Sequence, residues 1–91
     1  MSDRQFVVVV EAGLRKNSYG ADVRSSDRLG SEAAARFFDE VVAGQHPELF
    51  DPQPGTSLLR VSDTQLVAIR PRRLQPDELT RLTLSELVRT F

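Results

Sequence analysis

The stretch Phe6–Ala12, FVVVVEA, decides how this chain folds. Its four successive valines are branched at Cβ, which restricts their side chains and favours an extended backbone. Because apolar side chains occupy both alternating positions, both faces of this strand need cover, so the stretch predicts a central strand of a sheet. We interpret Glu11 as the point where the strand emerges into solvent.

Turn-forming residues follow between Gly13 and Gly20, and the segment ADVRS, Ala21–Ser25, predicts a second strand nearer the edge of the sheet. In that strand we expect Val23 to point inward and Asp22 and Arg24 to point outward. This alternation is typical of a strand with one buried face.

An amphipathic helix is predicted over Ser31–Val42. Ser31 suits the N-cap, Glu32 lies in the first turn, where the helix dipole favours a carboxylate, and Gly44 follows the C-terminus. One apolar stripe recurs at helical spacing, formed by Ala34, Phe37, Phe38, Val41 and Val42. We expect this stripe to pack on the sheet.

The segment Ser57–Pro71 predicts a hairpin that turns at Asp63 and Thr64. Pro71 ends its second strand, because proline has no N–H for the ladder. A two-residue turn gives one wholly apolar face by pairing Val61 with Leu66 and Leu59 with Ala68.

The last segment, Pro76–Phe91, predicts two short helices. Pro76 suits a first helical position, and Thr83 to Glu86 spells a capping box that starts a second helix. The element order is then ββ-α-ββ-αα over a single domain, residues 1–91. The fold class is α+β: a small, mainly antiparallel sheet of four strands with one main helix and two short C-terminal helices.

Composition excludes several classes of function. Twelve basic and thirteen acidic residues nearly cancel, which disfavours non-specific binding to nucleic acid or to an anionic membrane. The chain has no cysteine, so disulfides, cysteine zinc sites and thiol catalysis are excluded. The apolar run is too short for a signal-peptide core or a membrane span, and we expect a cytoplasmic protein.

No catalytic or metal-binding constellation is recognisable. His46 is the only histidine, and it has no partner at helical or hairpin spacing. The carboxylate pairs Asp39–Glu40 and Asp77–Glu78 are sequence neighbours, which point in different directions on a helix. We therefore expect no enzyme activity, no metal and no cofactor.

Three groups of residues are candidates for partner binding. The arginines Arg70, Arg72 and Arg73 either form a solvated strand end that meets nearby carboxylates, or recognise an acidic protein face or nucleic acid. Two apolar groups either pack on the protein's own core or contact a partner: the loop residues Leu49 and Phe50, and the C-terminal stripe of Leu84, Leu87, Val88 and Phe91.

Two partial resemblances begin at the first strand. FVVVVEAGLRKNSYGADV, Phe6–Val23, followed by an alanine-rich helix, resembles the opening of HicB-type antitoxins, in which a strand ending in Glu pairs with a second strand before a helix. The chain has RSSDRLG, Arg24–Gly30, where that family has a Pro-Asp-Leu-Pro-Gly-Cys stretch. FVVVVEAGLRKN with the later QLVAIRP also resembles the start and end of the small phycobilisome linker domain, and neither resemblance assigns the chain to a family.

These observations predict a small non-enzymatic protein-binding, adaptor or assembly module. We expect it to contact another protein with an acidic or apolar patch, to form homo-oligomers, and to use an apolar sheet or helix face while the arginines steer an acidic partner. The alternative is a nucleic-acid-binding or HicB-like antitoxin regulator.

Overall fold

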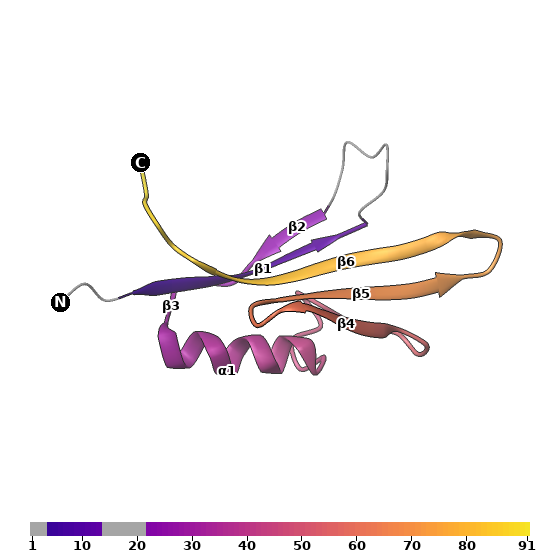
Figure 1. Ribbon diagram of the computed structural model, residues 1–91, viewed down its shortest axis with the longest axis horizontal. Coiled ribbons are helices and arrows are strands. Elements are labelled where there is room, and N and C mark those ends of the chain that lie inside the picture. Colours follow the sequence, from indigo (N-terminus) through magenta and orange to yellow (C-terminus); the bar gives the residue numbers. More distant parts are fainter. Residues whose placement is uncertain (1–3, 14–21) are drawn as a thin grey trace.

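The computed structural model describes residues 4–13 and 22–91. In these residues six strands form one antiparallel sheet, and one helix lies along one side of it (Figure 1). The elements are β1 Gln5–Ala12, β2 Asp22–Ser25, β3 Leu29–Gly30, α1 Ser31–Val42, β4 Ser57–Ser62, β5 Gln65–Arg72 and β6 Gln75–Glu86. The strand order is β2-β1-β6-β5-β4, and β3 pairs with β1.

The valine-rich strand β1 is central, as predicted, with β2 and β3 on one side and β6 on the other. Val8 and Val10 are buried beneath α1, whereas Val7 and Val9 lie on the opposite face of the sheet. The prediction of an edge position for β2 is also confirmed. Its predicted orientation is wrong: Val23 pairs with Glu11, away from the helix side, and is 59% exposed.

Helix α1 and its apolar stripe are confirmed. Phe38 and Val41 pack with Val8, Val10 and other sheet residues in one core cluster. Gly44 lies just past the helix with φ +81°, and its N–H donates to the Val41 carbonyl. The N-cap is Gly30, and Ser31 is the first helical residue, so the predicted cap is wrong by one position.

The predicted fold class is wrong in its strand and helix content. Residues 75–86 form the long strand β6 between β1 and β5, where two short helices were expected. Thr80, Leu82 and Leu84 alternate toward the helix side and pair there with Ala12, Val10 and Val8. Burial of this alternating set against two neighbouring strands outweighs the local helix signals, which come from a proline and a capping pattern.

The β4–β5 hairpin forms with its turn at Asp63 and Thr64, but its predicted register is wrong. A register shift lies between Arg60 and Ser62, so the observed partners are Leu66 with Arg60 and Ala68 with Leu58. A bulge of one residue exchanges the two faces of the strand. Leu59 therefore lies on the face opposite the helix, beside Val67.

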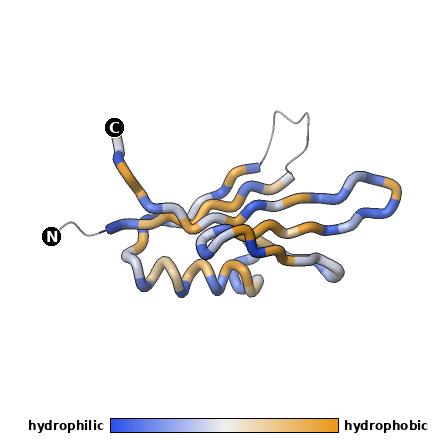
Figure 2. Tube along the Cα trace, in the orientation of Figure 1, coloured by the Kyte–Doolittle hydropathy of each residue, from blue (hydrophilic) through white to orange (hydrophobic). Residues whose placement is uncertain are grey.

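The β5–β6 hairpin projects beyond the other strands (Figure 1). Pairing to β4 ends at Ile69 and pairing to β1 ends at Thr80, so the segment from Arg70 to Glu78 pairs only with itself. The predicted end of β5 at Pro71 is wrong, because the strand continues to Arg72 with Pro71 at a register shift. Figure 2 shows this projecting end as mostly hydrophilic.

Candidate functional site

The face of the sheet opposite α1 is the first candidate surface. α1 is the one helix in the described residues, and its contacts lie on the other face, so no helical layer covers this one. Four apolar side chains adjoin there through strand pairing: Leu59 pairs with Val67 on β5, and Ile69 pairs with Leu79 on β6. We call Leu59, Val67, Ile69 and Leu79 the open-face patch.

An ion pair lies beside this patch. Arg81, which pairs with Val67, donates from Nε and Nη2 to the two carboxylate oxygens of Glu11, both at 2.9 Å. This bidentate arrangement is the strongest geometry available to an arginine and a carboxylate. Hydrogen bonding by Arg81, assisted by its charge and opposed by partial burial, holds the pKa of Glu11 below its ordinary value of 4.5. The two charges cancel, which leaves this part of the face neutral.

The ion pair predicts a pH-dependent stability difference. The pKa of Glu11 is lower in the folded than in the unfolded state, so its carboxylate stabilises the fold above the unfolded pKa, and this stabilisation is lost as the pH falls through the folded pKa. We expect Glu11→Gln to lower the free energy of unfolding at pH 7 by about 1 kcal/mol or less, because both side chains are partly exposed. Urea unfolding of both proteins at pH 7 and near pH 2 tests this, and an unchanged difference at the two pH values contradicts it.

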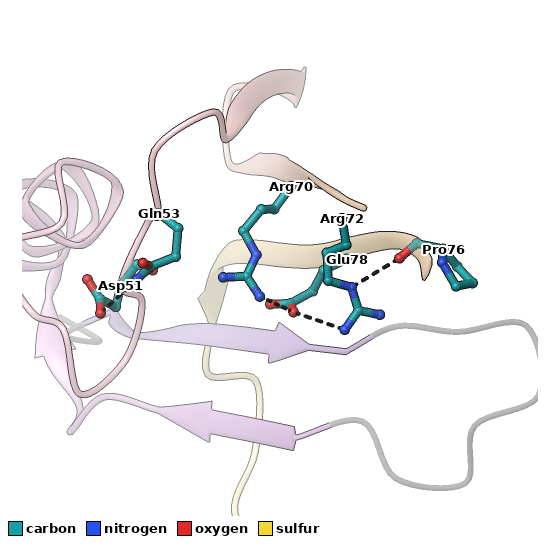
Figure 3. Close-up of polar contacts among 6 residues, drawn as sticks. All are labelled: Asp51, Gln53, Arg70, Arg72, Pro76 and Glu78. Atoms are coloured by element: carbon teal, nitrogen blue, oxygen red, sulfur yellow. Dashed lines mark hydrogen bonds and ion pairs between the residues drawn. The ribbon is translucent and has the colours of Figure 1, made fainter. Parts of the chain in front are cut away.

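A cavity of about 150 Å³ is the second candidate site. It lies on the helix side, between the loop that follows α1 and the outer ends of the strands, and its lining includes Thr56, Arg70, Glu78 and Thr80. Figure 3 shows Arg70 and Arg72 both directed toward Glu78: Arg70 Nη2 lies 2.6 Å and Arg72 Nη1 3.9 Å from Glu78 Oε2. Arg72 Nε also donates to the Pro76 carbonyl at 3.1 Å.

The chemistry of this cavity is that of a small polar pocket. Among the described side chains, two buried polar atoms have no hydrogen-bond partner, Thr56 Oγ1 and Arg70 Nε, and both residues line the cavity. Its volume is large enough for water molecules to enter and form hydrogen bonds with both atoms. The acidic and basic side chains of its wall occur together and largely compensate one another.

His46 has partners that the sequence did not indicate. Its Nε2 lies 2.8 Å from Glu40 Oε1, its ring packs 4.4 Å from the Phe37 ring, and its Nδ1 lies 3.6 Å from Glu48 Oε1. These contacts fasten the end of α1 to the following loop. Within the residues that the structure describes, no three His, Asp or Glu side chains come together in a way that would hold a metal ion.

The structure places the predicted arginines at the projecting hairpin. Arg70 and Arg72 are engaged by Glu78 and by the Pro76 carbonyl, and Arg73 is exposed in the turn. Arg70 and Arg72 therefore lie at a strand end beside a carboxylate, which is the first of the two interpretations given for this arginine cluster.

The predicted apolar contact residues are dispersed. Phe50 is buried in the core, and Leu49 packs against it. The C-terminal stripe does not form one surface, because Leu84 belongs to β6 and contacts the core, while Leu87, Val88 and Phe91 follow the strand. Leu87 is half-buried, whereas Val88 and Phe91 are exposed, with the guanidinium of Arg89 over the Phe91 ring.

Sequence reasoning missed the open-face patch. Its residues on β5 and β6 alternate with the buried Leu66, Ala68 and Leu82, so their period of two was visible in the sequence. Leu59 was assigned to the opposite face, because the bulge near Val61 carries no glycine or other local signal.

Comparisons with protein-family models, with curated proteins and with solved structures each returned no match to this chain. In the described ranges, 4–13 and 22–91, no helix has the length and apolar character needed to cross a membrane.

Proposed function

We propose that this protein is a small non-enzymatic protein-binding module whose contact surface is the open-face patch. The observation that supports it is the adjacency of Leu59, Val67, Ile69 and Leu79 on a sheet face that no helix covers within residues 4–13 and 22–91. Contiguous apolar side chains on an open face are typical of protein-contact surfaces. We place the module in the cytoplasm, because it has no cysteine for the disulfides that small secreted domains use.

The chemistry of the partner follows from the patch. Arg81 is occupied by Glu11, so the surface beside the patch presents a compensated charge pair rather than a free cation. The partner is therefore a protein that offers an apolar, uncharged surface of its own. Arg70 and Arg72 have carboxylate or carbonyl partners within the hairpin, so they contribute little to the attraction of an acidic partner.

The absence of cysteine permits a specific crosslinking test. Ile69→Cys places one thiol in the patch, and Ala35→Cys places one on the exposed side of α1 as the matched control. Each variant is labelled with a benzophenone maleimide and irradiated in an extract of its own cells. We expect one discrete adduct from position 69 and none from position 35.

Competition by unlabelled protein tests whether the crosslinked adduct forms through the patch. An excess of unlabelled wild-type protein should abolish the adduct, while an excess of Val67→Lys should not, because a lysine at the patch centre disrupts its apolar contact. The proposal is wrong if position 69 gives no adduct, or if Val67→Lys competes as well as the wild type.

A further inference from the structure

The outer edge of the sheet at β4 is the most exposed apolar element of the described chain. Among the described strands β4 pairs with β5 alone, on one side, and every one of its residues is exposed. Leu58 is 42%, Leu59 50% and Val61 59% exposed. An edge strand presents a row of unpaired N–H and C=O groups, and apolar side chains on it favour pairing with another strand.

The opposite edge is protected against such pairing. β2 has four residues, and Asp22 and Arg24 form an ion pair within it at 2.8 Å. Arg24 also donates to the Glu48 carbonyl, which ties this edge to the loop after α1. Short length, charge and loop cover are the devices that keep an edge strand from pairing. β4 has one charged residue, Arg60, and its guanidinium donates within the strand to the Ser62 carbonyl at 3.5 Å.

Symmetry restricts how two β4 strands can pair. Two copies of one strand that pair in antiparallel fashion are related by a two-fold axis perpendicular to the sheet, so one residue lies opposite itself. A centre at Arg60 places like charges opposite each other, which is unfavourable. A centre at Leu59 pairs five residues of β4, 57–61, whereas a centre at Leu58 pairs three, and the centre at Leu59 places Arg60 opposite Leu58 of the second copy.

We propose that β4 pairs with β4 of a second copy in antiparallel register centred on Leu59, which joins two sheets into one continuous sheet. The strand that pairs with β4 comes from a second copy because the edge is complementary to itself. In this register Leu59 lies opposite Leu59, and each Arg60 lies opposite a leucine. The same axis keeps both helices on one side and brings the two open-face patches together on the other. The inference concerns the edge and does not depend on the partner proposed for the patch.

The dimer is expected to be reversible. Five paired residues extend over about 17 Å, which is a short contact compared with that of a stable complex. We therefore expect a dissociation constant of about 10⁻⁵–10⁻³ M. Sedimentation equilibrium over a concentration series that covers this range measures it directly.

The matched variants are Leu59→Lys on β4 and Val23→Lys on β2, two half-exposed side chains on opposite edges of the sheet. We expect Leu59→Lys to raise the dissociation constant at least tenfold and Val23→Lys to leave it within twofold. Circular dichroism confirms that both variants are folded. A wild type that stays monomeric to 1 mM, or equal effects of the two lysines, overturns the proposal.

A disulfide tests the register independently. Residues directly opposite each other in an antiparallel pair have Cα atoms about 4.5–5.5 Å apart, within disulfide range. Because the chain has no cysteine, Leu59→Cys gives one thiol, and mild oxidation should yield a covalent dimer. Ala35→Cys on the exposed side of α1 should remain monomeric under the same conditions. Crosslinking of both variants to the same extent, or of neither, overturns the register.

Failure of this dimer is distinguishable from failure of the proposed function. Ile69→Lys alters the patch but not the edge, so it should leave the dissociation constant unchanged while the protein no longer competes in the crosslinking test. Loss of self-association on Ile69→Lys shows contact between open faces, whatever the effect of Leu59→Lys, because Leu59 belongs to the patch as well as to the edge, and this outcome overturns the edge dimer. A β4 edge that pairs only with an extended segment of another protein, and never with itself, also overturns it.

Discussion

Leu82→Ala should remove about 3 kcal/mol from the free energy of unfolding. Leu82 is fully buried on β6, where it pairs with Val10 on one side and Leu66 on the other and joins the cluster beneath α1. Truncation leaves a cavity that three elements line, and a well-packed sheet relaxes little around it. For a domain whose total stability is about 5–15 kcal/mol, this is a large fraction. Urea unfolding followed by circular dichroism measures the loss.

Leu74→Ala is the control for this truncation. Leu74 lies in the turn of the projecting hairpin and is 98% exposed, so the same substitution removes no buried contact. We expect its free energy of unfolding to lie within about 0.5 kcal/mol of the wild-type value. Equal losses for the two variants contradict the position of β6 in the core.

Val8→Lys should leave the protein unfolded at 25 °C. Val8 is 0% exposed in the central strand and belongs to the cluster beneath α1, whose described members are all apolar. Burial of an unpaired charge costs more than about 4 kcal/mol, a loss that approaches the stability of a small domain. The far-ultraviolet circular dichroism spectrum and the dispersion of amide resonances report the outcome.

The adjacent residue provides the matched control, because Val9→Lys moves the same change to the other face of β1. There the lysine has Glu11 on the same face two residues away and can extend into solvent. We expect Val9→Lys to remain folded. If it unfolds as completely as Val8→Lys, the face opposite α1 is covered, and the open-face patch cannot be a contact surface.

The sequence predicted those elements of the fold whose signals lie within a few neighbouring residues. The valine run in β1, the apolar stripe of α1 and the turn at Asp63 each have a signal within a few residues, and the structure confirms all three. The segment 75–86 has two compatible patterns, helical stripes and a strand alternation. Pairing of β6 with β1 decides between them, and that pairing joins residues about seventy positions apart, as Glu11 and Arg81 are.

One bulged residue of β4 decides on which face of the sheet Leu59 lies. The bulge near Val61 exchanges the faces of β4, and so it moves Leu59 from the core side to the open-face patch. Bulges that lack a glycine have no local sequence signature, so the patch could be recognised only from the observed strand register. The pairing of Arg81 with Glu11 could not be predicted for a different reason, because it requires β6 to lie beside β1.

The place of β6 between β1 and β5 also has a consequence for the order in which the chain can fold during synthesis. The ribosome releases β1 before the other described strands, yet β6, the neighbour that completes its sheet, follows all of them. Until residue 86 has emerged, the valine run has only β2 and β3 beside it and a free edge on the other side. Such long-range pairing slows folding and leaves apolar edges open to wrong partners in the meantime. A nascent chain stalled before β6 should therefore be the form that molecular chaperones bind.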